Sequence, residues 1–158
     1  MADRYRTLSA VFPVFLQPDG GKTRILLAKR ANTGYMDGMW DFAGSGHVDE
    51  GETATSAVIN ECREELGIEV NAKDISLAHF CHRLGINGAR TYYDLYFYVK
   101  EYTGTPFIAE PDKCDGLAWF FIDDLPEDMI ILRQEALSHI LAGTPYSEFI
   151  ADGLVIQG

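Results

Sequence analysis

The chain has 158 residues, with 24 acidic and 13 basic side chains and a formal net charge of −11 at pH 7. So acidic a chain lacks the basic face that a nucleic-acid polymer or an anionic membrane needs, which argues against both as partners. The length and a hydrophobic content of 47% suit one domain, which we place at residues 1–158. There is no long apolar run and no signal-peptide pattern, and the three cysteines are far apart. These features predict a reduced, cytoplasmic protein.

The first part of the chain is rich in strand-forming residues. Residues 5–17 and 23–29 read as strands, and the Pro-Asp-Gly-Gly sequence between them is a turn signal, so the two are predicted to pair as a hairpin. A turn-rich loop follows at 31–38. A short strand at 39–42 then leads into a glycine-rich loop.

A helix is predicted to begin after Thr53, which is a suitable N-cap residue. Gly67 stands where a left-handed residue commonly ends a helix. Apolar residues recur every four positions between them and form a predicted buried stripe. These residues are Ala54, Val58, Cys62 and Leu66.

The same helix concentrates negative charge. Glu61, Glu64 and Glu65 are three and four residues apart, so they lie on neighbouring positions of one helix face. Like charges at this spacing repel by about 0.2–0.5 kcal/mol per pair, and a bound cation would remove that cost. Oxygen ligands on a rigid helix suit a hard ion such as Mg²⁺ or Mn²⁺. The alternative is an acidic helix face that is simply solvated.

The second part of the chain completes an α/β pattern. Residues 75–84 and 89–102 read as two strands joined by an Asn-Gly turn, and residues 117–122 as a short apolar strand. Residues 129–141 form a second amphipathic helix, whereas the tail at 144–158 carries no readable chemistry. The order of elements predicts an α/β sandwich in which a mixed, curved β-sheet lies between two helices.

The order of residues from 46 to 68 is more specific than any single cluster. Gly46 is followed after five residues by Glu52, and after seven more by Asn-Glu-Cys-Arg-Glu-Glu-Leu-Gly-Ile at 60–68. This stretch resembles the Nudix box, in which Gly, five residues, Glu and seven residues precede Arg-Glu-apolar-any-Glu-Glu-any-Gly-apolar. Asn60 departs from the pattern, because the family carries there an arginine that helps to hold the box carboxylates. The resemblance extends over nearly the whole chain.

The resemblance implies the Mg²⁺-dependent hydrolysis of a nucleoside diphosphate linked to another moiety, with Mn²⁺ as an alternative ion. It implies that Glu64 and Glu65 are the main metal ligands and that Glu61 is a ligand or a base. Glu52 would be an outer ligand or an organiser of the loop, and the backbone carbonyl of Gly46 would be a further ligand. The expected partner is a small nucleotide, and because dimers are frequent in the family, a homodimer is an expected assembly.

Charged residues outside the helix are further candidates. Lys29 and Arg30 end a predicted strand and either contact substrate phosphates or simply reach solvent. Relatives often place an extra carboxylate, as a metal ligand or base, in the loop before the short apolar strand. Glu110, Asp112 and Asp115 are the candidates in this chain, and their spacing does not choose among them.

Two other functions stay open. Asn60 favours a catalytically weak Nudix domain that binds or senses a nucleotide, although the retained box glutamates argue against it. An isopentenyl-diphosphate isomerase-like enzyme shares the same box. Analogy at the level of the fold cannot decide, because function resides in the site.

Overall fold

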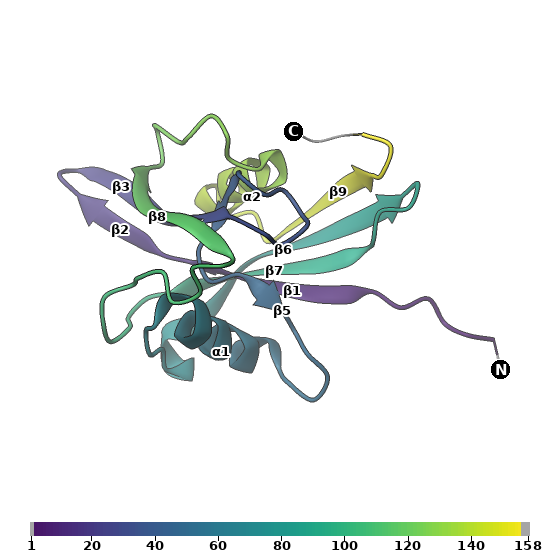
Figure 1. Ribbon diagram of the computed structural model, residues 1–158, viewed down its shortest axis with the longest axis horizontal. Helices are drawn as coiled ribbons and strands as arrows, with labels where there is room; N and C mark the ends of the chain where they lie inside the picture. Colours follow the sequence, from purple (N-terminus) through teal and green to yellow (C-terminus); the bar gives the residue numbers. More distant parts are fainter. Residues whose placement is uncertain (1, 156–158) are drawn as a thin grey trace.

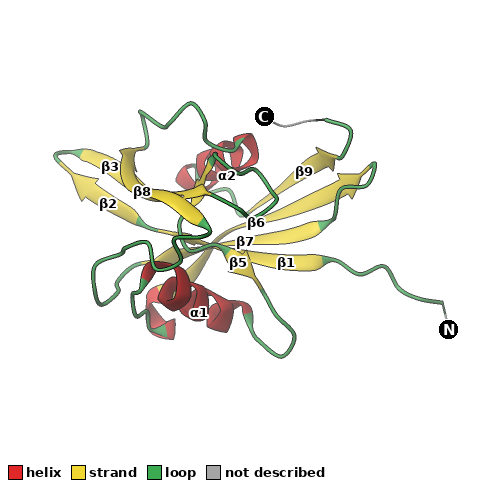
Figure 2. Ribbon diagram, in the orientation of Figure 1, coloured by secondary structure: helices red, strands yellow, loops and turns green. Residues whose placement is uncertain are grey.

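The computed structural model describes residues 2–155, which form two β-sheets and two α-helices (Figures 1 and 2). One sheet contains, in spatial order, β5 (Gly46–His47), β1 (Leu8–Val14), β7 (Tyr92–Val99), β6 (Ile75–Ile86) and β9 (Tyr146–Asp152). In the other, β3 (Lys22–Arg30) pairs with β8 (Cys114–Phe121) along one side and with β2 (Leu16–Asp19) and β4 (Trp40–Phe42) along the other. The helices are α1 (Ala54–Leu66) and α2 (Ile131–Leu141), and a short 3-10 helix spans Ala72–Asp74. Within residues 2–155, no helix is long and apolar enough to cross a membrane.

The two helices cover opposite faces of the five-stranded sheet. Successive side chains of a strand point to opposite faces. In β1, Val11 packs in one buried cluster with Val58 of α1, whereas Phe12 packs in the other cluster with Leu132 of α2. The predicted α/β sandwich with a mixed sheet between two helices is therefore confirmed.

The predicted first hairpin is correct only for its second half. The chain leaves β1 at the buried residue Phe15 and enters β2 in the other sheet. β2 pairs with β3 around the turn at Gly20 and Gly21, whereas β1 pairs in parallel with β7. Residues 5–17 thus contribute to both sheets.

The caps of α1 form as predicted from their sequence. The Thr53 side chain accepts a hydrogen bond from the Ser56 backbone N–H, and Gly67 ends the helix in the left-handed conformation with φ of 63°. A side chain at position 67 would also overlap the ring of Phe107, so packing and backbone both require glycine there. The buried stripe contains Ala57, Val58, Cys62 and Leu66, while the predicted member Ala54 is half-buried.

Longer-range contacts change other boundaries. The Asn87-Gly88 turn has positive φ angles of 52° and 89°, as expected, but its strands extend to Ile86 and resume only at Tyr92. The second helix begins at Ile131, two residues later than predicted. The tail contains a strand that the sequence did not reveal, because β9 lies in parallel beside β6 as an edge strand.

Candidate active site

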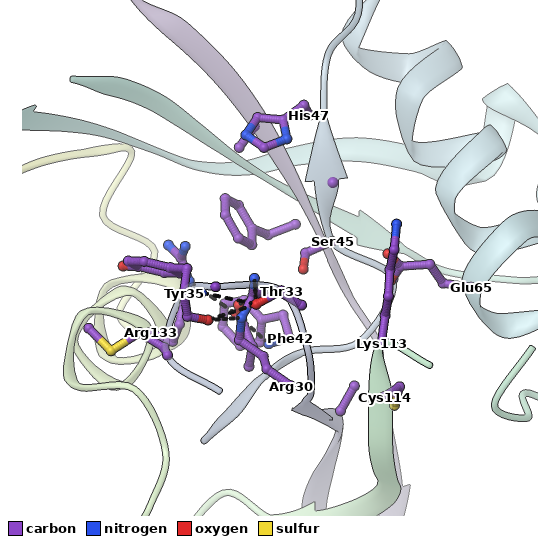
Figure 3. Close-up of a pocket in the computed structure, with 18 of the residues that line it drawn as sticks. Arg30, Thr33, Tyr35, Phe42, Ser45, His47, Glu65, Lys113, Cys114 and Arg133 are labelled. Atoms are coloured by element: carbon purple, nitrogen blue, oxygen red, sulfur yellow. Dashed lines mark hydrogen bonds and ion pairs between the residues drawn. The ribbon is translucent and has the colours of Figure 1, made fainter. Parts of the chain in front are cut away.

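A cavity of about 960 Å³ is lined by both sheets, both helices and the loops between them (Figure 3). Its volume suits a ligand of nucleotide size. Six cationic side chains contribute to the lining, although the chain as a whole is strongly acidic. They are Lys29, Arg30, Arg83, Arg90, Lys113 and Arg133.

Glu61 and Glu65, one helical turn apart on α1, form an acidic wall of this cavity. Burial and then the negative charge of Glu64 raise the pKa of Glu61 to about 7. Burial and then the negative charge of Glu61 raise the pKa of Glu65 to about 8. Both carboxylates are thus held where a negative charge is costly unless a cation compensates it.

The other predicted metal ligands take different positions. Gly46 lies on the cavity wall against the carboxylate of Glu61, which lines the cavity together with Glu65. Glu64 is exposed and, like Glu52, lies outside the lining that the described residues form. Among residues 2–155, no three His, Cys, Asp or Glu side chains form a closed ligand group. The carboxylates of Glu61 and Glu65 offer oxygen atoms to the cavity, which fits a hard divalent cation.

Glu52 is held in place by its neighbours in the box. It accepts hydrogen bonds from the Asp49 backbone N–H over 3.0 Å and from the Asn60 side-chain amide over 2.9 Å. The Asn60 carbonyl oxygen in turn accepts a hydrogen bond from Arg63 over 3.5 Å, and Arg63 is fixed by two bonds of 2.9 and 3.0 Å to Glu69. Asn60 therefore contacts a box carboxylate although it replaces the family's arginine.

The loop after β7 brings one further carboxylate to the cavity. The backbone N–H groups of Phe107 and Ala109 donate to the last carbonyls of α1 over 3.1 Å each, which anchors this loop on the helix. Glu110 follows directly, lines the cavity and raises the pKa of both helix carboxylates that face it. Of the other two candidates, Asp112 and Asp115, both are exposed. The structure thus favours Glu110.

The two predicted substrate cations are committed to other contacts. The Lys29 ammonium lies 3.5 Å from Asp128. Arg30 donates to the Tyr35 carbonyl over 2.7 Å and to Thr33 and Asp41 over 3.1 Å each, so it supports the loop at 31–38.

Lys113 is a cation that the sequence analysis missed. It lines the cavity, and its side chain is 64% exposed with Glu110 at 3.8 Å. Figure 3 shows it on the same side of the cavity as Glu65. The sequence around Lys113, at the end of an acidic loop, did not indicate that this residue lines a cavity. Its position depends on the packing of the loop on α1, which only the fold reveals.

The floor of the cavity is a buried polar network that also escaped prediction. Arg133 of α2 is 2% exposed and donates to Asp41 over 3.1 Å, to Asp94 over 3.3 Å and to the Tyr96 hydroxyl over 2.7 Å. One signal existed, because Arg133 stands four residues from Met129 in the apolar row of the predicted second helix. A charged residue in such a row needs buried partners.

This α/β sandwich, with box carboxylates on a cavity wall, matches one known class of proteins. The NUDIX domain family model matches residues 7–140, so the chain belongs to the Nudix family, as its box predicts. The solved MutT NUDIX hydrolase from Burkholderia pseudomallei is 28% identical, with a TM-score of 0.73 over 85% of this chain and 98% of that one.

Curated relatives match over shorter stretches. A CTP pyrophosphohydrolase of Escherichia coli (strain K12) is 38% identical over 69 residues, which are 44% of this chain and 48% of that protein. An isopentenyl-diphosphate Delta-isomerase of Salmonella heidelberg (strain SL476) is 38% identical over 61 residues, which are 39% of this chain and 32% of that protein. The chain thus spans about half, or less, of the length of these relatives.

Proposed function

We propose that the chain hydrolyses a phosphoanhydride bond of a nucleoside diphosphate linked to another moiety, with Mg²⁺ as its cofactor and Mn²⁺ as a substitute. The observation that carries the proposal is the pair of helix carboxylates, Glu61 and Glu65, with raised pKa values on the wall of a cavity of nucleotide size. Membership of the Nudix family and the match to a pyrophosphohydrolase support the same reaction class.

The proposed ligands are the oxygen donors of the box. Glu61, Glu65 and the Gly46 carbonyl would hold the ion from the cavity wall, and Glu64 would complete the set from the exposed rim of α1. When bound, the ion supplies compensation of phosphate charge and a lowered pKa of an attacking water. Glu52, held by Asn60, would keep the loop between β5 and α1 in position.

Other residues bind the substrate and move the proton. Lys113 is the proposed phosphate contact, because its ammonium group is exposed at the same cavity. Glu61 or Glu110 would take the proton from the attacking water, since both carboxylates line the cavity. The stretch at 31–38, supported by Arg30, closes another side of the site.

Three wider features belong to the proposal. A cytoplasmic location fits the cysteines Cys62, Cys81 and Cys114, all of which are free thiols. One domain across residues 1–158 and a homodimeric assembly are also proposed. Size-exclusion chromatography with light scattering tests the assembly directly.

A release assay tests the reaction. The protein is incubated with triphosphates, ADP-ribose, dinucleoside polyphosphates and nucleotide sugars in Mg²⁺, with EDTA as the control, and products are identified by mass. We expect one class to be cleaved at a phosphoanhydride bond, with no cleavage in EDTA. Tight binding without turnover would instead indicate a nucleotide sensor.

Isomerisation is a second candidate, because an isopentenyl-diphosphate isomerase matches over 61 residues. Isopentenyl diphosphate is therefore included in the panel. A product with unchanged mass but a different retention time would indicate isomerisation, whereas loss of phosphate indicates hydrolysis.

A further inference from the structure

Two buried arginines share one carboxylate on the cavity floor. Arg83 of β6 donates from Nε and Nη2 to Asp94, over 2.9 Å each, and Arg133 of α2 donates from Nη1 to the same carboxylate over 3.3 Å. Arg133 also donates from Nε to Asp41 and from Nη1 to the Tyr96 hydroxyl. Arg83 is 7% exposed and Arg133 is 2% exposed, and both line the cavity.

Each guanidinium keeps one terminal nitrogen for a ligand. Nη1 of Arg83 and Nη2 of Arg133 donate to no partner among the described residues. Yet within residues 2–155 no fully buried side-chain nitrogen or oxygen lacks a hydrogen-bond partner. These two nitrogens are therefore not fully buried, and the cavity is an open space that both arginine side chains line.

The same network extends toward the loop at 31–38. Arg30 joins it through a 3.1 Å contact with Asp41, and the charge of Arg30 also acts on the carboxylates of Asp37 and Glu65. Figure 3 shows Arg133 at the opposite side of the cavity from Glu65, so the two ends of the site differ in polarity.

Flat surfaces surround these donors. The guanidinium carbon of Arg133 lies 3.8 Å from the centroid of the Phe12 ring, and that of Arg83 lies 4.1 Å from the centroid of Tyr92. Phe42 also lines the cavity. Stacked guanidinium and aromatic planes fit a planar heterocycle. A compact tetrahedral phosphate would make no use of them.

We propose that Arg83 and Arg133 form a subsite for a nucleobase that carries a ring carbonyl oxygen, as cytosine, uracil and guanine do, in preference to adenine. The inference rests on the proposed function, because it assigns the base of the nucleotide substrate. Guanidinium groups are donors only, so they bind a carbonyl oxygen but cannot accept from the exocyclic amino group of adenine. The phosphates would then extend toward the wall formed by Glu61 and Glu65.

A matched pair of nucleotides tests the subsite without any turnover. Inosine 5′-monophosphate and purine riboside 5′-monophosphate differ only in the 6-oxo group and the ring proton that accompanies it. Binding to the metal-free wild-type protein is measured by isothermal titration calorimetry. We expect Kd to be about tenfold lower, or more, for the inosine nucleotide. Equal Kd values, or no binding of inosine monophosphate, would overturn the subsite.

Because neither nucleotide contains a phosphoanhydride bond, this result is independent of hydrolysis. A preference for the oxo base in a protein that cleaves nothing would leave the subsite standing while the proposed function fails. If the protein cleaves nucleotides but binds the two monophosphates with equal Kd values, the proposed function stands and the subsite is wrong.

Substitutions then assign the effect to the two arginines. Arg83→Lys and Arg133→Lys keep a charge beside Asp94 but remove the terminal guanidinium nitrogen that has no partner among the described residues, so we expect the ratio of the two Kd values to fall toward one. Arg24→Lys is the control, because Arg24 bonds to Gln17 away from the cavity, and it should keep the wild-type ratio. An unchanged ratio in both cavity variants contradicts the assignment. If a variant fails to fold by circular dichroism, the nucleotide pair on the wild type decides alone.

Inorganic phosphate provides the last arm of the test. Phosphate should not displace inosine monophosphate through the arginines. If phosphate competes in the wild type and this competition disappears in Arg133→Lys, the arginines bind an anion and the base assignment is wrong.

Discussion

The carboxylate of Glu61 lies directly against the backbone of Gly46. A methyl group built on Gly46 would have the two carboxylate oxygens at 2.5 and 2.6 Å, closer than side-chain carbons tolerate. The φ angle of Gly46 is not positive, so its backbone conformation does not require glycine. The close approach of the Glu61 carboxylate favours glycine here instead. The contact joins the first residue of the box to the helix and sets the backbone of β5 beside a proposed metal ligand.

Gly46→Ala should therefore displace the Glu61 carboxylate and destabilise the protein by about 0.5–1.5 kcal/mol, because the added methyl group forces that side chain out of its present rotamer. It should also lower Mg²⁺-dependent turnover. Urea unfolding measures the first effect and the release assay measures the second. In the double variant with Glu61→Ala the overlap is gone, so the stability loss due to Gly46→Ala should largely vanish; strict additivity would contradict the contact.

Asn60 supplies the second prediction. Since its amide already holds Glu52, Asn60→Ala should cost about 0.5–1.5 kcal/mol in stability and lower turnover. Asn60→Arg should bring little gain, because the contact that the missing arginine would make is already present. A large rise in kcat for Asn60→Arg would show that the departure from the box limits catalysis. Gln17→Ala, which removes a bond to Arg24 outside the site, is the matched control and should leave turnover unchanged.

Features that depend on residues close together in the chain could be predicted from the sequence, whereas features that depend on distant residues could not. The ends of α1 were predictable because Thr53 and Gly67 act on their own helix, and the Asn87-Gly88 turn because its geometry is local. β9 was missed because an edge strand in a parallel pair takes its support from β6, more than sixty residues away in the chain. The buried polar network around Arg133 was not predicted because its partners are also distant in the chain, although a charged residue in an apolar row of the helix indicated that buried partners were needed.

The pH dependence of stability supplies the third prediction. Glu61 and Glu65 have pKa values of about 7 and about 8 in the folded protein, against an ordinary value of 4.5. Between pH 4.5 and 8 the folded protein thus holds protons at these groups that the unfolded chain has released. Their contribution to stability is full below pH 4.5 and is lost as the pH rises through 7 and 8.

The measurement is the urea midpoint of metal-free protein at pH 5 and pH 8.5, for the wild type and for Glu65→Gln. The wild type should lose more stability than the variant between these two conditions. Mg²⁺ should stabilise the wild type more at pH 8.5 than at pH 5, because protons compete with the ion for the carboxylates. A larger loss of stability in Glu65→Gln than in the wild type, or a larger effect of Mg²⁺ at pH 5 than at pH 8.5, would contradict the buried environment assigned to Glu61 and Glu65.

Lys113 supplies the fourth prediction. If its ammonium group contacts a substrate phosphate, Lys113→Ala should raise KM by about tenfold, the effect of losing one charge-assisted hydrogen bond. The fold should be unaffected, because the side chain is largely exposed. Lys22→Ala is the control, since Lys22 is similarly exposed and pairs with Asp123 on another part of the surface. An unchanged KM in Lys113→Ala would exclude the contact.

The central claim is that α1 carries carboxylates that bind the divalent ion required for hydrolysis. The most direct measurement is Mg²⁺-dependent turnover of Glu65→Gln on the substrate that the panel identifies, with Glu135→Gln of the exposed face of α2 as the control and circular dichroism as the check on folding. We predict a loss of about a hundredfold or more in kcat for Glu65→Gln and no loss for Glu135→Gln. Near wild-type turnover in a folded Glu65→Gln variant would contradict the account.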